Sequence, residues 1–325
     1  MKRTLYSFCL KGDVNAAYDY LQNINSNKET EKLKQKYYNR FYSGKPIFRY
    51  KTKDNWIKNV IKTYNEYFIF VLTNKIDRIE AEKYLKENLL TLLLNYNGIK
   101  DIDSIEDRLA KEFKLRGYYF LGGITPPYRG PYIWGKEEIV EYEVKLPDRT
   151  KKVKVHFMSD FIMQSWLHFA TFGGRSAGGW ATNNSLFCVK ERYEKILNRP
   201  DFTISYLAHE AQHLADYEDY PSLCSRDLEY RAKLVELIYH PLNHKTLMKK
   251  FIMDADNNRI NPHPYANFII CNNLSQMIFN QNQISDPKEW AKVDSNTLSY
   301  CAKELLQKHT DSLNNKGKQQ VESII

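Results

Sequence analysis

The 325-residue sequence predicts an α+β fold that is mainly helical. Apolar residues recur at helical spacing through the first 115 residues and again after residue 201. Between these parts, residues 140–157 alternate apolar with charged side chains, which is typical of half-buried strands. We therefore expect an all-helical N-terminal region over 1–115 and a second region over 116–325, in which a small β-sheet precedes a group of helices.

Amphipathic segments predict the helices of the N-terminal region. Asp13 follows Gly12 and is a suitable N-cap for a helix that begins with the amphipathic segment 14–21. Segments 54–72 and 79–96 continue the helical pattern. No period is sustained over three units, which argues against a solenoid repeat. This region is expected to be a helical cap on the domain that follows.

The pattern changes near residue 116, where glycine and proline interrupt the helical spacing. Residues 140–146 and 153–157 alternate as strands do, and the turn residues 147–150 between them predict a β-hairpin. The further elements expected before residue 190 are a short helix over 161–169, a flexible glycine-rich stretch over 173–179 and strand structure over 180–189.

Helical spacing returns in the last third of the chain. Asp201 is a candidate N-cap for a helix that runs to about Tyr217, and Pro221 forces a break after it. Ser225 or Asp227 is expected to cap a second helix that ends near Tyr239. Three more helical segments are predicted over about 245–255, 265–279 and 287–309.

Composition excludes some classes of protein. Hydrophobic residues make up 42% of the chain and aromatic residues 14%, so the chain has enough apolar surface for a core and is not disordered. The net charge of +9 could indicate a nucleic-acid partner, but the lysines are spread along the chain. The densest basic run, 151–154, falls in the expected hairpin, so we expect a solvated basic surface and no nucleic-acid partner.

Cysteine use and hydropathy bear on location. The five cysteines are an odd number without a CxxC pair, as expected for free thiols in a reducing compartment. The apolar run 4–10 is too short for the core of a signal peptide, and no segment is long enough to span a membrane. The chain is therefore expected to be soluble and cytoplasmic, although a chain whose leader had been removed would have the same features.

The most specific motif is His209-Glu210-Ala211-Gln212-His213, an HExxH pattern. Residues four apart lie on one face of a helix, so both imidazoles can reach one Zn²⁺ ion. Glu210 lies about 100° round the helix and can act on a water molecule beside the metal. The alternative is an ordinary amphipathic helix that carries two histidines.

A catalytic zinc ion needs a third protein ligand and one open position. Glu229 is the best candidate, because it lies 16 residues after His213 on the helix expected beyond the proline break. Glu236, two helical turns further along the same face, is the reserve. Asp219 fits a different pattern, in which the ligand lies six residues after the second histidine. That pattern needs a glycine where this chain has Asp216, so Glu229 is preferred.

With these residues the chain resembles gluzincin-type zinc metallopeptidases, the clan of thermolysin, over about residues 117–279. The resemblance implies a zincin-like catalytic region in which His209, His213 and Glu229 bind Zn²⁺ and Glu210 is the general base. The chain departs from the thermolysin pattern at Lys233, where an aspartate would orient the first histidine. Asp216 is a candidate for that role, and the alternative for it is a solvent-facing carboxylate.

The resemblance also implies residues that contact the substrate. Thermolysin-like enzymes supply a histidine or tyrosine from the start of a downstream helix to stabilise the oxyanion. His263 matches that position and Tyr265 is the second choice, although a loop histidine between two prolines would look the same. In gluzincins an upstream edge strand pairs with the peptide, and here the candidate substrate-binding residues are Gly179, Trp180 and Ala181. The alternative for that segment is a hinge followed by a core tryptophan.

These features predict a zinc-dependent peptide hydrolase that acts on a peptide or protein. Two other functions stay open: a catalytically inactive zinc-binding or peptide-binding protein of zincin fold, and a helical protein-interaction module. Glu210 argues against the first, because a purely structural zinc site has no use for a base at that place. The absence of a sustained repeat argues against the second.

Overall fold

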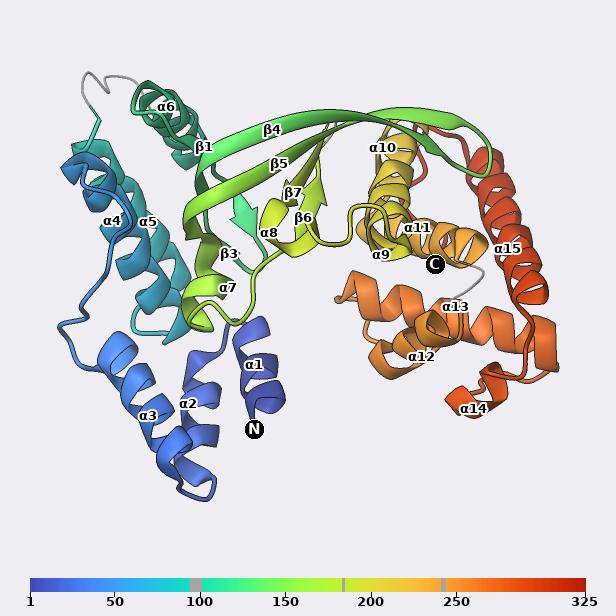
Figure 1. The fold of residues 1–325 in the computed structure, drawn as a ribbon, viewed down its shortest axis with the longest axis horizontal. Coiled ribbons are helices and arrows are strands. Elements are labelled where there is room, and N and C mark those ends of the chain that lie inside the picture. The colour runs from blue at the N-terminus through green and yellow to red at the C-terminus, as the bar shows by residue number, and fades with distance from the viewer. Residues whose placement is uncertain (94–100, 183–184, 241–243) are drawn as a thin grey trace. The chain divides into compact units, whose positions relative to one another are not determined.

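The structure is a computed structural model that describes residues 1–93, 101–182, 185–240 and 244–325 (Figure 1). The described chain is α+β and mainly helical, as predicted, and it divides into two compact units. Unit 1 comprises Met1–Glu137 and Met158–Ala177, and unit 2 comprises Glu138–Phe157 and Gly178–Ile325. Each unit buries its own hydrophobic core. The predicted helical region over 1–115 therefore lies in unit 1, together with later residues.

Helices make up most of unit 1. They are α1 (Lys2–Leu10), α2 (Val14–Asn23), α3 (Lys28–Tyr37), the π-helical η1 (Tyr38–Tyr42), α4 (Asn55–Leu72), α5 (Arg78–Thr91), α6 (Ile102–Leu115) and α7 (Ser165–Ala170). Asp13 caps α2 as predicted, because its carboxylate accepts a hydrogen bond from the Ala16 amide at 2.8 Å. Helix α5 ends at Thr91, and residues 94–96 of the helix predicted there lie outside the described residues.

The predicted hairpin is present and its strands are longer than expected. The strands are β1 (Tyr119–Leu121), β2 (Ile124–Thr125), β3 (Tyr128–Arg129), β4 (Tyr132–Lys145), β5 (Thr150–Gln164), β6 (Gly179–Ala181) and β7 (Leu186–Val189). One sheet has the order β1-β4-β5-β7-β6, and β2 pairs with β3 in a second. The helix predicted over 161–169 begins only at Ser165, because Phe161 and Met163 are buried alternately with their neighbours and continue strand β5.

The helices of unit 2 follow β7. They are α8 (Lys190–Tyr193), α9 (Pro200–Phe202), the π-helical η2 (Thr203–Ala208), α10 (His209–Asp219), α11 (Ser225–Tyr239), α12 (His244–Asp254), α13 (Pro262–Phe279), α14 (Pro287–Trp290) and α15 (Ser295–Lys316). Helices α10, α13 and α15 all pack against α11 (Figure 1). Helix α11 is therefore the central helix of this unit.

Several predicted helix boundaries in unit 2 are wrong. Arg199 is the N-cap of α9 and Pro200 is its first residue, so Asp201 does not cap the helix. The N-cap of α11 is Cys224, and Asp227 lies inside the helix with its side chain fully buried. The segment predicted as one helix over 287–309 is two helices, because Asp294 caps the second with bonds to two backbone amides.

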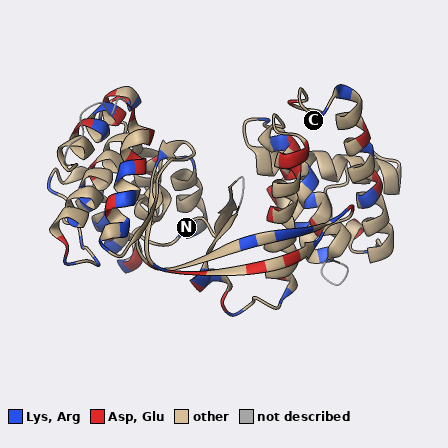
Figure 2. Ribbon diagram, turned by 90° about the horizontal axis from the view of Figure 1, so that it is seen from above, with Lys and Arg blue, Asp and Glu red and all other residues tan. Residues whose placement is uncertain are grey.

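Charged residues of both signs are interspersed along the described helices (Figure 2). On the hairpin, Glu141 and Glu143 of β4 lie opposite Lys154 and Lys152 of β5, at 3.6 and 3.4 Å. Two lysines of the basic run are therefore paired with acidic residues on the neighbouring strand. The five cysteines all lie in the described ranges and are free thiols. Among the described helices, none combines the length and the apolar character needed to cross a bilayer.

Candidate metal centre

Helix α10 presents the two histidines of the HExxH motif. It begins at His209, directly after the π-helical turn η2, and His213 follows one turn later. Each histidine is only 7% exposed. Their ring centroids are 4.8 Å apart with the ring planes perpendicular. The two imidazoles therefore lie together on one face of the helix, as the four-residue spacing predicts.

Helix α11 brings Glu229 to the same place. Its Oε1 lies 3.3 Å from His213 Nε2, and its Oε2 lies 3.6 Å from His209 Nε2. The three ligand atoms lie within 4.8 Å of one another. Around a tetrahedral zinc ion with bonds of about 2.0–2.1 Å, ligand atoms are separated by roughly 3.3 Å. The two nitrogen–oxygen distances are therefore close to those that one shared ion would impose.

The environment of Glu229 supports a bound cation. The residue is 8% exposed, and its Oε2 atom is buried without a hydrogen bond from the described residues. A buried carboxylate is costly unless positive charge lies beside it, and here the imidazoles of His209, His213 and His263 or a bound cation can supply that charge. Two imidazoles and one carboxylate form the donor set of catalytic zinc sites. His209, His213 and Glu229 therefore fit a divalent metal ion.

Glu236 orients the first histidine. Its Oε1 atom accepts a hydrogen bond from His209 Nδ1 at 2.7 Å, and the side chain is 4% exposed. This bond holds the proton on Nδ1 and leaves Nε2, the atom nearest Glu229, free to bind a metal. Glu236 therefore takes the orienting position for which Asp216 was a candidate, and it is not in the group of potential metal ligands. Glu236 lies seven residues after Glu229, so both carboxylates lie on one face of α11.

Asp216 has a different part in this structure. Its Oδ1 atom accepts hydrogen bonds from Arg231 Nε at 2.8 Å and from Gln212 Nε2 at 2.9 Å. The residue is 1% exposed, so it is neither the partner of His209 nor a solvent-facing carboxylate. The ion pair with Arg231 ties α10 to α11 beside the histidines. Neither Arg231 nor this pair was predicted from the sequence.

The charges of the centre shift the ionisation of its members. Burial lowers the pKa of His213, but the adjacent carboxylate of Glu229, with Glu210 and Asp216, outweighs burial and raises the pKa overall. Burial raises the pKa of Glu229, but the imidazoles of His213, His263 and His209 hold that pKa well below its usual range. The carboxylate and the imidazoles therefore shift each other's pKa in opposite directions, as expected for groups that attract one another.

Glu210 lies beside the centre with its carboxylate uncommitted. The side chain is half-buried, and it forms no hydrogen bond or ion pair with the described residues. Its negative charge is one of those that raise the pKa of His213. A general base must be free to bond to the water or substrate whose proton it takes. The arrangement of Glu210 meets this condition.

Of the two candidate oxyanion donors, only His263 lies next to the centre. It is in the first turn of α13, its side chain is 68% exposed, and its Nδ1 atom lies 2.6 Å from Glu229 Oε2. At this distance the imidazole of His263 can form an ion pair with Glu229 when it is protonated. Tyr265 is 9% exposed, and its ring packs near Arg259 and Phe268. These positions favour His263 over Tyr265 as a group that can reach a bound substrate.

The predicted substrate segment forms the edge strand β6, which packs against α10. Gly179 and Ala181 pair with Cys188 and Leu186 of β7, and among the described residues the other edge of β6 has no strand partner. The Trp180 ring stacks on Phe187 with centroids 5.8 Å apart. Within the part of the chain that the structure describes, β6 is therefore the last strand of the sheet at this edge.

Asp219, the alternative third ligand, is not part of the group of potential ligand atoms, and it forms an ion pair with Arg149 at 2.5 Å. Two further histidines have other contacts: His156 stacks on Phe187, and buried His244 lies 3.2 Å from the Val293 carbonyl through Nε2.

We compared the chain with protein-family models, with curated proteins and with solved structures, and none of the three comparisons gives a match. The geometry of the centre itself is therefore the basis on which its function is argued.

Proposed function

We propose that this chain is a zinc-dependent peptide hydrolase with a zincin-like catalytic region. The observation that carries the proposal is the convergence of His209, His213 and Glu229, whose ligand atoms lie within 4.8 Å of one another. Two further carboxylates support it, because Glu236 orients His209 and Glu210 is uncommitted beside the ligands. A site that served only to stabilise the fold would not need an uncommitted base next to an open position.

In this proposal each residue of the centre has its own role in the hydrolysis. A zinc ion held by the three ligands would lower the pKa of a bound water toward about 7 and polarise the substrate carbonyl. Glu210 takes the proton of the attacking water and passes it to the leaving amine. His263 is positioned to donate a hydrogen bond to the oxygen on which charge develops. Glu236 keeps His209 in the tautomer and orientation that the ligand needs.

The edge strand β6 supports a peptide as the substrate. An extended peptide can add to the free edge of a sheet through main-chain hydrogen bonds. Gly179 allows no larger residue, since a Cβ atom there would lie 2.4 Å from the Phe187 carbonyl oxygen. In this proposal Gly179, Trp180 and Ala181 align the peptide, and α10, which packs on the same strand, presents Glu210.

The experiment compares two glutamates of the same helix. The full chain is loaded with zinc, its metal content is measured, and cleavage of a peptide library is followed by mass spectrometry. Glu210→Gln is expected to keep the metal and to lose about 10²- to 10⁴-fold in turnover. Glu218→Gln is the matched control, because Glu218 is on α10 but pairs with Lys151 on the surface. Unchanged cleavage by Glu210→Gln would reject the hydrolase.

A catalytically inactive zinc-binding or peptide-binding protein is the second candidate. The free edge of β6 would serve such a protein equally well. The same experiment separates the two functions. An inactive protein binds zinc and peptide, but neither the parent chain nor the two glutamine variants cleave any member of the library.

A further inference from the structure

Unit 1 contains a cavity whose charged lining is entirely basic. Its volume is about 860 Å³, within the range of about 300–1,000 Å³ that ligand sites occupy. The lysines and arginines that line it are Lys36, Arg40, Lys45, Arg49 and Lys51, and no aspartate or glutamate is among the lining residues. The chain as a whole has 39 acidic residues against 48 basic ones, so composition alone does not explain the absence of carboxylates.

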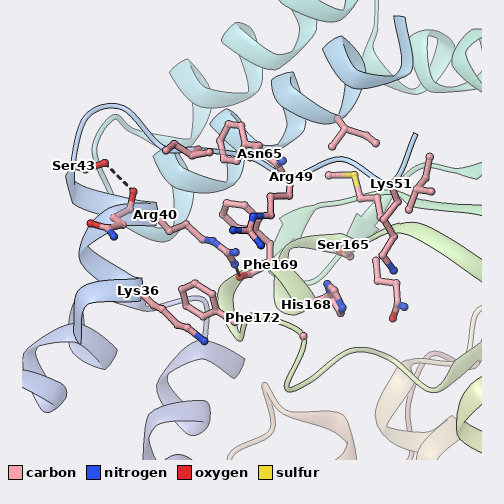
Figure 3. A pocket seen from close by; sticks show the side chains of 18 of the residues that line it. Lys36, Arg40, Ser43, Arg49, Lys51, Asn65, Ser165, His168, Phe169 and Phe172 are labelled. Atoms are coloured by element: carbon pink, nitrogen blue, oxygen red, sulfur yellow. Dashed lines mark hydrogen bonds between the residues drawn. The ribbon is translucent and has the colours of Figure 1, made fainter. Parts of the chain in front are cut away.

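The basic residues come from one continuous stretch of the chain. Lys36 is at the end of α3, Arg40 is in η1, and the other three lie in the segment that leads to α4 (Figure 3). The opposite wall is formed by the end of β5 and by α7, which contribute residues 162–165 and the aromatic ring of Phe169. Every one of these elements belongs to unit 1.

Arg40 is fixed as a cation inside this cavity. Its guanidinium carbon lies 3.8 Å from the ring centroid of Phe172 and 4.6 Å from that of Phe169. One Nη atom donates a hydrogen bond to the Phe169 carbonyl oxygen. Burial lowers the pKa of Arg40 to about 10, so the group is still charged at neutral pH. Most of its five N–H donors remain available, because this is its only hydrogen bond to the described residues.

The neighbouring cations also lack acidic partners. Within the described ranges, Lys36, Lys45 and Arg49 form no ion pair, and Lys51 donates only to the Phe161 carbonyl at 3.1 Å. Figure 3 shows the Arg40 and Arg49 side chains directed toward the same cavity. Like charges gathered around one cavity repel one another, so an anion bound between them would be stabilised by all of them.

A polar side chain of α4 also lines the cavity. Asn65 of α4 is 8% exposed and lines the cavity, and its amide forms no hydrogen bond with the described residues. A ligand with oxygen acceptors could accept hydrogen bonds from both the Asn65 amide and the Arg40 guanidinium.

From these observations we propose that the cavity of unit 1 binds a phosphate-bearing small molecule with at least two negative charges. Guanidinium and ammonium donors from several directions match the oxygens of a diphosphate or polyphosphate. The apolar wall, which includes Ile61, Ile162 and Met163, leaves room for an organic part such as a nucleoside. This site is separate in residues and chemistry from the metal centre of unit 2.

Titration calorimetry of the full chain tests the proposal, with inorganic pyrophosphate and ATP as the probes. Both are expected to bind, and binding is expected to weaken as salt is added. Arg49→Gln and Lys51→Gln are each expected to weaken binding by about tenfold or more. Lys53→Gln is the matched control, because Lys53 is an exposed lysine of the same segment that does not line the cavity, and its change should be under about twofold.

The two probes also distinguish the kinds of ligand. Equal affinities show that the phosphates alone are recognised, and tighter binding of ATP shows that an organic part contacts the apolar wall; either result supports the site. Absence of binding at millimolar concentrations, or binding that Arg49→Gln and Lys51→Gln leave unchanged, overturns it. The proposal is also overturned if a single-stranded oligonucleotide binds far more tightly than ATP and Lys53→Gln weakens that binding as much as Arg49→Gln and Lys51→Gln do. Circular dichroism of each variant verifies that it is folded, and Glu210→Gln should bind the probes like the parent chain.

Discussion

The bond between Glu236 and His209 gives the sharpest test of the metal centre. The two groups are 4% and 7% exposed, and Oε1 and Nδ1 are 2.7 Å apart. Replacement of Glu236 by alanine removes a charge-assisted hydrogen bond and leaves the buried Nδ1 donor unpaired. Loss of such a partner lowers metal affinity by about 10- to 100-fold. That range corresponds to about 1.4–2.7 kcal/mol.

The glutamine variant separates charge from geometry. Glu236→Gln keeps a carbonyl oxygen that can accept from His209 Nδ1, but it removes the negative charge that strengthens the bond. We expect a loss in zinc affinity of about tenfold or less, between those of the parent chain and Glu236→Ala. Competition with a chromophoric zinc chelator measures all three affinities, and Glu218→Gln serves as the surface control.

The result that would refute this reasoning is specific. If Glu236→Ala binds zinc as tightly as the parent chain while circular dichroism shows that it is folded, the orientation of His209 by Glu236 has no part in metal binding. Loss of affinity in Glu218→Gln would be equally damaging, because Glu218 is an exposed residue outside the centre.

Three further outcomes follow from the structure. Because the pKa of His213 is raised, a proton competes with the metal at higher pH than it would at an ordinary histidine. Zinc affinity should therefore fall on acidification, and zinc binding near pH 7 should release protons that a pH indicator detects. Burial raises the pKa of Asp227, but its hydrogen bonds outweigh burial and lower the pKa overall. The ionised carboxylate therefore stabilises the folded state fully above the unfolded pKa of about 3.9, and this contribution is lost as the pH falls through the lower folded pKa. Asp227→Asn should therefore cost about 2–4 kcal/mol in urea denaturation at pH 7, and the difference should shrink below about pH 4. Gly179→Ala should destabilise the fold by about 1–3 kcal/mol in thermal melts, since its Cβ would lie 2.4 Å from the Phe187 carbonyl oxygen, and an unchanged melting temperature would contradict the packing of β6.

The sequence was sufficient for features that depend on local spacing. The four-residue spacing of His209 and His213 places both rings on one helix face, and the structure brings Glu229 to them from the helix after the proline break. The alternation over 140–157 correctly predicted the hairpin. These features need only the period of one element or the order of two adjacent ones.

Features that depend on tertiary contacts were not predictable in this way. The π-helical turn before His209 was expected as regular helix, because the apolar spacing of residues 204–208 does not reveal an extra residue in a turn. Asp227 looks like an N-cap in the sequence, but in the fold it binds His309 and the backbone of Ile324. Its partners are too distant in the chain for a local pattern to indicate them.

One helix of unit 2 connects the metal centre with the C-terminal segment. Helix α11 delivers Glu229 to the histidines, and less than one turn earlier its Asp227 grips the amide of Ile324 at 2.8 Å. A metal ion that binds Glu229 would restrict the motion of α11 and therefore of Asp227 as well. Slower hydrogen exchange at the Ile324 amide would then report occupancy of a centre that this amide never touches.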